Sequence, residues 1–254
     1  MLLALDIGNS TINAALFSGD DLIARLNVSS TVQRTGDETW NVIDSFLAPH
    51  LLIQGLAGVG ISSVVPFQTT LFASLVREKI HKEALLISSA LDLPIHILYE
   101  NPSQLGPDRI CTAVAGFIKH GAPLIIIDFG TATTFGVVDA SGNFLGGAIS
   151  LGVKSNAEAL YRRTAQLPQI DLTLPQQAIG RDTISGMRSG TMFGVIDAVE
   201  GMVTRIRREL GSDAKVIATG GLSEVMSKQM PVIDTHEPML ALEGIRLIYD
   251  RNRK

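Results

Sequence analysis

Two short acidic turns, one in each half of the chain, carry residue types that could do chemistry. In the first, Asp6 ends an apolar run and precedes Gly8 and several polar residues. In the second, Asp128 ends the run Leu-Ile-Ile-Ile and precedes Gly130 and hydroxyl side chains. Backbone N–H groups and hydroxyls of such turns contact phosphate oxygens, and a carboxylate beside them manages cations and protons. The two turns indicate a protein that grips a polyphosphate from both sides of a cleft.

The turns recur at a constant distance in the sequence. Asp128 follows Asp6 by 122 residues, and the same offset aligns the next glycines and places Thr133 over Thr11. This offset is close to half of the 254 residues, which predicts an internal duplication of a strand, a polar turn and a second strand. A single Asp-x-Gly would be explained more simply as a hairpin turn, because Asp and Gly favour turns. Two copies with Thr at the same place favour phosphate binding.

A third group of candidate residues lies in the segment 100–109. Two prolines and a glycine exclude regular structure there. The segment ends with Asp108 and Arg109, directly before a predicted helix over residues 110–118. A carboxylate at this place can cap the helix. Beside an arginine on a rigid loop, it can also be held in one ionised geometry, and the spacing does not decide between the two roles.

The composition excludes several classes of protein. With 46% hydrophobic and 18% charged residues, the chain has a substantial core and is not disordered. A net charge of −4 and a pI near 5.7 give no basic patch, so we expect no nucleic-acid partner. Cys111 is the only cysteine, which excludes an internal disulfide and a cysteine-rich metal site. No apolar run approaches the ~20 residues that span a membrane and no secretory signal is present, so we expect a cytosolic protein.

Alternating strand and helix patterns must position the candidate residues. Each acidic turn is flanked by two predicted strands, and the Gly-Gly pair at 220–221 is a candidate nucleotide-contact turn. The glycine-rich run 146–152 indicates close backbone approach between elements. Together with the duplication, these patterns predict an α/β chain with two similar halves. Further strands are predicted at residues 22–28, 56–59, 94–99 and 215–219, and helices at 39–47, 69–82, 110–118, 156–164, 185–210 and 240–249.

The helical pattern over residues 185–210 is the longest in the chain and contains four glycines. Gly186, Gly190 and Gly194 recur about once per turn, which lets another helix approach closely. A dimer interface and a tight crossing within the chain are the two explanations.

Four motifs in this order resemble those of type III pantothenate kinases: Asp6-Ile-Gly-Asn-Ser10, Gly106-Pro-Asp-Arg109, Asp128-Phe-Gly-Thr-Ala-Thr133 and Ala218-Thr-Gly-Gly221. The resemblance covers nearly the whole chain, and the joint order of the motifs is far more specific than any one. It implies the fold of the actin, Hsp70 and sugar-kinase superfamily, with two ribonuclease-H-like domains around a nucleotide cleft. The domains would be residues 1–117 and residues 118–254, the second with a dimerisation helix. Two departures are Ser10, where Thr is usual, and Leu151, where a proline with its fixed φ is common.

The resemblance implies ATP-dependent phosphorylation of pantothenate, the first step of coenzyme A synthesis, by a homodimer. Asp108 would be the base that takes the proton from the pantothenate hydroxyl. Asp6 would lie near Mg²⁺, and Asp128 would hold a monovalent cation, K⁺ or NH₄⁺. The residues implied for ATP are Asp6, Ile7, Gly8, Asn9, Ser10, Thr11, Ile12, Asn13 and Thr131. The residues implied for pantothenate are Tyr99, Gly106, Pro107, Asp108, Arg109 and Thr183.

Electrostatics support the need for cations. A chain of net charge −4 that brings three aspartates toward a polyphosphate is repulsive unless cations intervene. Two other functions keep the same fold: a kinase for a sugar or acetate-like acceptor, and a catalytically silent ATP-binding regulator. The Gly106–Arg109 motif argues against the first, and an intact Asp108 argues against the second.

Overall fold

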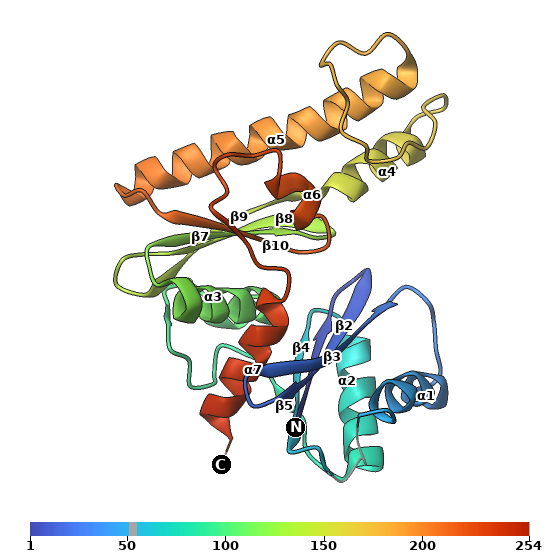
Figure 1. Cartoon of the computed structure of the whole chain (residues 1–254), viewed down its shortest axis with the longest axis vertical. Helices are drawn as coiled ribbons and strands as arrows, with labels where there is room; N and C mark the ends of the chain where they lie inside the picture. Colours follow the sequence, from blue (N-terminus) through green and yellow to red (C-terminus); the bar gives the residue numbers. More distant parts are fainter. Residues whose placement is uncertain (51–54, 254) are drawn as a thin grey trace. The chain divides into compact units, whose positions relative to one another are not determined.

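The apolar runs that precede the two acidic turns form the central strands of two β-sheets (Figure 1). These strands, β1 (Leu2–Ile7) and β7 (Leu124–Phe129), are buried almost throughout their length. The computed structural model describes residues 1–50 and 55–253. The chain divides into two units, one formed by Met1–Lys119 with Met239–Lys254 and the other by His120–Pro238. The predicted fold class, α/β with one sheet in each half, is confirmed.

The sheet of the first unit has the strand order β3-β2-β1-β4-β5. The first three strands are antiparallel neighbours, whereas β1, β4 and β5 run parallel. Successive side chains of a strand point to opposite faces. Leu3, Leu5 and Ile7 therefore enter the core beneath α1 and α2, and Asp6 points to the other face. The strands are β2 (Thr11–Ser18), β3 (Asp21–Ser29), β4 (Gly58–Ser63) and β5 (Leu85–Leu86).

The helices of the first unit begin with strong local signals. Thr35 and Glu38 form a reciprocal capping box at the start of α1, and Pro66 opens α2. The predicted strand over 94–99 is only two residues long, β6 (His96–Ile97). The remaining elements are α1 (Gly36–Leu47), α2 (Pro66–Leu75) with a π-helical turn at Val76–Ile80, a 3₁₀ turn at Pro102–Gln104, α3 (Pro107–His120) and α7 (Leu240–Asn252).

The second unit repeats this topology. Strands β9-β8-β7-β10-β11 follow the same order and directions as β3-β2-β1-β4-β5. The predicted duplication is therefore confirmed by the topology. The glycine-rich run 146–152 was predicted to allow close backbone approach between elements, and no strand was predicted there. It lies mostly within β9. The strands are β8 (Ala132–Val138), β9 (Asn143–Leu151), β10 (Lys215–Thr219) and β11 (Thr235–His236).

The strand register corrects one detail of the predicted repeat. Asp6 pairs with Asn13, whereas Asp128 pairs with Thr134. The second turn is thus one residue shorter, and Thr133 corresponds to Ile12 rather than to Thr11. Like Ile12, the Thr133 side chain is buried. The alignment of Thr133 with Thr11 was therefore wrong.

The long helix α5 (Thr183–Leu210) covers the second sheet through one apolar stripe. A cap at Asp182 begins it, and Gly211 in the left-handed region ends it. Gly190, Gly194 and Gly201 are exposed, and a Cβ atom built on any of them meets no other part of the described chain within 4 Å. The glycine spacing of α5 is therefore not explained by a tight helix crossing within the described chain. The other helices of this unit are α4 (Val153–Arg163) and α6 (Ser223–Ser227).

The C-terminal helix packs on the first unit, although it was expected to be part of the second domain. Residues 118–254 were expected to form one domain, but α7 packs on β1, β2 and β4 of the first unit (Figure 1). Its residues Ile245 and Ile248 are fully buried, and Arg246 bonds to Asp20 at 2.6 Å. An amphipathic helix shows that it needs an apolar partner but does not show which sheet supplies it. Among the described helices, none is long and apolar enough to cross a membrane.

Candidate functional site

Asp6 lies at the carboxyl end of β1, between polar residues of both neighbouring strands. Its register partners are Asn13 on β2 and Ser62 on β4. The Ser62 hydroxyl donates a hydrogen bond to Asp6 Oδ1 at 3.1 Å. Ser62 was not identified from the sequence, although the carboxyl end of a parallel strand next to Asp6 is a usual place for a ligand-facing side chain.

The polar turn after Asp6 is closed by its own backbone. The Gly8 N–H donates to the Thr11 carbonyl at 2.9 Å, and the Ser30 N–H donates to the Ser10 carbonyl at 3.0 Å. Asn9, Ser10 and Thr11 are exposed, as residues that contact a phosphate chain must be. Ile7 and Ile12 were also predicted to bind ATP. Their side chains lie in the apolar core, so only their backbone atoms are available for this.

Asp108 lies in the first turn of α3. Its Oδ1 accepts the Arg109 backbone N–H at 2.8 Å, so the carboxylate does interact with the helix N-terminus. The Gly106 carbonyl accepts the N–H groups of Arg109 and Ile110 at 3.1 and 3.2 Å. A Cβ atom at Gly106 would collide with the Asp108 carboxylate, which explains why glycine occupies this position.

Asp6 and Asp108 form one acidic site in the first unit. Burial, followed by the negative charge of Asp108, raises the pKa of Asp6 to about 6, against the opposing effect of the Ser62 and Asn13 hydrogen bonds. Burial also raises the pKa of Asp108, while the N–H and the positive charge of Arg109 lower it. Two partly buried carboxylates that repel each other favour binding of a proton or a cation.

Cys111 lies beneath this acidic site and has no place in the predicted chemistry. It is fully buried, and burial together with the charge of Asp6 raises the pKa of its thiol. A thiol in these surroundings stays protonated and acts as a small apolar side chain.

The predicted pantothenate residues Tyr99 and Arg109 are brought together beside Asp108. The Arg109 guanidinium carbon lies 6.0 Å from the centroid of the Tyr99 ring, and Arg109 is 9% exposed. At this distance the ring attracts the guanidinium by a cation–π interaction and helps to orient it. A buried, oriented guanidinium is suited to bind a carboxylate.

The second unit holds Asp128 in the corresponding place. Asp128 is the penultimate residue of β7 and pairs with Thr219, the last residue of the parallel strand β10. Gly220 follows with a φ of +92°, and a Cβ atom there would collide with Asp128 Oδ1 and the Phe129 backbone. The predicted Gly-Gly turn therefore packs directly on the candidate cation ligand.

Thr131 and Thr183 lie on the surface of the second unit. The Thr131 carbonyl accepts the Gly152 N–H at 3.1 Å and the Ser155 hydroxyl at 2.7 Å, which fixes the turn that carries its exposed side chain. Thr183 is the first residue of α5 and is also exposed. Leu151, which replaces the usual proline, ends β9 and pairs with Ala132, so the turn forms without a proline.

The described residues contain no group of three or more His, Cys, Asp or Glu side chains that could hold a metal ion. The acidic site offers carboxylate oxygens, the ligand type that Mg²⁺ takes in phosphoryl-transfer enzymes.

The fold defines the class of protein. The chain superposes on the activator of 2-hydroxyisocaproyl-CoA dehydratase from Clostridium difficile with a TM-score of 0.53, over 98% of this chain and 95% of that one, at 11% identity. This is the two-domain nucleotide-binding fold shared by actin-like ATPases and sugar kinases.

The family follows from sequence comparison. Residues 2–205 match the model of the family described as type III pantothenate kinase. The chain is 39% identical to a type III pantothenate kinase from Moorella thermoacetica over 99% of this chain and 100% of the relative. It is 41% identical to one from Brevibacillus brevis over the full length of both. The chain belongs to the type III pantothenate kinase family.

Proposed function

We propose that the chain transfers the terminal phosphoryl group of ATP to the hydroxyl of pantothenate, in the first step of coenzyme A synthesis. The observation that carries the proposal is the acidic site formed by Asp6 and Asp108 beside the exposed turn Gly8–Thr11, in a member of this family. The hydroxyl oxygen attacks the terminal phosphorus as the bond to the bridging oxygen breaks. ADP leaves, and the hydroxyl proton passes to Asp108.

Asp108 serves as the general base. Its raised pKa, caused by burial, makes it a better proton acceptor than an exposed carboxylate. The Arg109 N–H at 2.8 Å holds one of its oxygens, so the other can face the substrate. A moderate base suffices, because in a loose transition state the proton leaves late.

The exposed turn holds the ATP phosphates, and Asp6 lies near Mg²⁺. The residues assigned to ATP are those predicted from the sequence, with Ile7 and Ile12 contributing backbone atoms. When bound, Mg²⁺ would neutralise the phosphate charge, and Asp6 would be the side chain that holds it, next to Asp108. The pKa of Asp6 is raised first by burial and then by the negative charge of Asp108, and a bound cation would relieve both effects.

Pantothenate is recognised through its carboxylate. The buried Arg109 guanidinium, oriented by the Tyr99 ring at 6.0 Å, provides a charged partner close to Asp108. Gly106 and Pro107 shape the loop, and Thr183 is a further residue that the family resemblance assigns to pantothenate.

A monovalent cation, K⁺ or NH₄⁺, is held by Asp128. The support is the packing of Gly220 on the Asp128 carboxylate, which brings backbone near a side chain that prefers a cation. We also propose a cytoplasmic location. Membership of the type III pantothenate kinase family supports this location, and no structural feature bears on it.

The active species is a homodimer formed through α5. Support comes from the exposed glycines of this 28-residue helix, above all Gly190 and Gly194, on which nothing in the described chain packs. Glycines on an exposed helix face permit close approach of a second helix.

The deciding experiment is an assay of ADP formation with ATP and candidate acceptors, in K⁺ and in tetramethylammonium buffer. We expect turnover with pantothenate, little with sugars or acetate, and strong suppression when tetramethylammonium replaces K⁺. Turnover with a sugar alone would support the alternative acceptor. ATP binding without turnover on any acceptor would support the silent regulator, and equal rates in both buffers would remove the cation from Asp128.

A further inference from the structure

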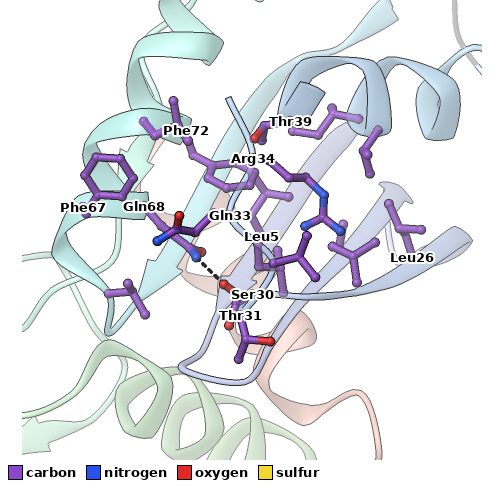
Figure 2. Close-up of a pocket in the computed structure, with 18 residues that line it drawn as sticks. Leu5, Leu26, Ser30, Thr31, Gln33, Arg34, Thr39, Phe67, Gln68 and Phe72 are labelled. Carbon is purple, nitrogen blue, oxygen red and sulfur yellow. Dashed lines mark hydrogen bonds between the residues drawn. The ribbon is translucent and has the colours of Figure 1, made fainter. Parts of the chain in front are cut away.

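A cavity of about 520 Å³ lies in the first unit, between the sheet, α1 and α2 (Figure 2). Its volume is in the range of roughly 300–1,000 Å³ that is typical of small-molecule sites. Leu5 of β1 lines it, whereas the adjacent Asp6 points to the opposite face of the sheet. The cavity is therefore separate from the acidic site.

The cavity has an apolar body and a polar end. Aliphatic and aromatic side chains of the sheet and both helices form most of its wall, and the exposed ring of Phe67 stands at its edge. In Figure 2 the polar side chains of the segment after β3 and of α2 lie between Phe67 on one side and Leu26 on the other. These polar residues are Ser30, Thr31, Gln33, Arg34 and Gln68.

Two polar atoms at this end lack the partners that buried polar atoms normally have. Gln68 Nε2 donates to the Ser30 backbone carbonyl at 2.9 Å, which holds the Gln68 side chain next to Ser30. Ser30 Oγ and Gln68 Oε1 are nevertheless buried without any hydrogen-bond partner in the described chain. Buried polar side-chain atoms are satisfied in the large majority of cases, so each exception calls for an explanation such as a missing ligand.

Arg34 adds a positive charge to the same end. Its Nη1 donates to the Ser29 carbonyl at 2.9 Å. The neighbouring Glu38 carboxylate accepts hydrogen bonds from the Thr35 N–H at 2.8 Å and the Thr35 hydroxyl at 3.1 Å, and these bonds, with the charge of Arg34, lower its pKa. A cation beside an apolar cavity selects a ligand with one anionic group and an apolar body.

We propose that this cavity binds an aliphatic carboxylic acid of medium chain length. The alkyl chain occupies the apolar body, between Leu5 and Ile12 of the sheet and Phe72 of α2. The carboxylate accepts hydrogen bonds from the Arg34 guanidinium and the Ser30 hydroxyl. Binding at this site does not depend on the proposed kinase function.

A backbone hydrogen bond connects the polar end of the cavity to the exposed turn Gly8–Thr11. The Ser30 N–H, at the polar end of the cavity, donates to the Ser10 carbonyl at 3.0 Å. A ligand that orders Ser30 and Arg34 thereby also orders the turn. Occupancy of the cavity by the carboxylic acid is expected to change the affinity for ATP by a few fold. This effect on ATP binding rests on the proposed function, whereas binding of the acid does not.

The test is isothermal titration of the full-length protein, without nucleotide, with octanoate, 1-octanol and octylammonium. Octanoate should bind at one saturable site, more tightly than 1-octanol, and octylammonium should not bind. Arg34→Gln should weaken octanoate at least about tenfold without changing 1-octanol, and Arg34→Lys should retain most of the affinity. The matched control is Arg77→Gln, since Arg77 is exposed and pairs with Glu83.

A second variant guards against effects on folding. Val28→Phe places a ring in the cavity and should block octanoate and 1-octanol alike, with a melting temperature at or above that of the wild type. The proposal is overturned if octanoate does not bind saturably, if Arg34→Gln and Arg77→Gln behave alike, or if Val28→Phe is folded and still binds octanoate normally. It is also overturned if pantothenate displaces octanoate competitively, because the cavity would then be the substrate site. Loss of kinase activity on pantothenate with intact octanoate binding would reject the proposed function alone.

Discussion

The negative charge of Asp108, in the first turn of α3, adds to burial in raising the pKa of Asp6, at the end of β1, to about 6. The two carboxylates come from segments about a hundred residues apart in sequence and meet within one folding unit. Neither alone would define a site for phosphoryl transfer. In the proposed function, a divalent cation relieves their repulsion next to the exposed turn Gly8–Thr11, and Asp108 is the base.

The first prediction concerns Asp6 in the metal-free protein. Its pKa of about 6 in the folded state exceeds the ordinary value of 3.8. The group therefore stabilises the fold below pH 4, and this contribution is lost as the pH rises through 6. Asp6→Asn removes the effect and should stabilise the metal-free protein at pH 7 relative to the wild type, by at most about 3 kcal/mol. Urea unfolding at pH 4 and pH 7 measures this.

The same titration makes the effect of Mg²⁺ depend on pH. Mg²⁺ should raise the melting temperature of the wild type at pH 7.5 more than at pH 5, because protons compete for Asp6 below pH 6. Asp6→Asn should lose most of this gain. A gain in the wild type that is equal at both pH values, or that persists in the variant, would remove Asp6 from the cation site.

The second prediction concerns Arg109. Arg109→Gln should raise the KM for pantothenate by at least about tenfold, because a charged hydrogen bond contributes about 1.5–3 kcal/mol. The KM for ATP should change little. Tyr99→Phe should be mild, since the ring that orients the guanidinium remains, and Tyr99→Ala should resemble Arg109→Gln in direction. Steady-state kinetics with each substrate varied separates these effects, and a change confined to the KM for ATP would contradict the assignment.

The third prediction concerns the exposed glycines of α5. A Cβ atom at Gly194 meets nothing within 4 Å in the described chain, so Gly194→Glu should leave the fold of the monomer intact. If α5 is the dimer interface, this substitution should convert the protein to a monomer in sedimentation experiments. Gly194→Ala, a much smaller change at the same position, should remain largely dimeric. A Gly194→Glu protein that stays a dimer would place the interface elsewhere.

Much of the fold could be predicted because the governing signals are local. The apolar runs that end at Asp6 and at Asp128 indicated buried strands. The constant offset between the two runs indicated the repeated topology. The offset could not reveal the shorter second turn, because the missing residue is compensated before β9, which again follows β3 by 122 residues. Thr133 was therefore aligned with Thr11, although its register partner makes it a core residue.

The parts that escaped prediction depend on long-range packing. The helix over 240–249 was correctly identified, but the sheet on which it packs depends on tertiary contacts with β1 and β4. Asp108 was assigned two possible roles from its place before a helix, and only the structure shows that Asp6 lies close enough to be affected by its charge. Ser62 was missed because a Ser-Ser pair at a strand end is too common to stand out before its neighbouring strand is known.

The central claim is that Asp108 takes the proton from pantothenate. The most direct measurement is kcat for ATP and pantothenate in the wild type, in Asp108→Asn and in the exposed control Asp21→Asn. The account predicts that Asp108→Asn remains folded, with the melting temperature little changed, while kcat falls by a factor of at least roughly 10² and Asp21→Asn behaves as the wild type. A folded Asp108→Asn protein with undiminished kcat would contradict it.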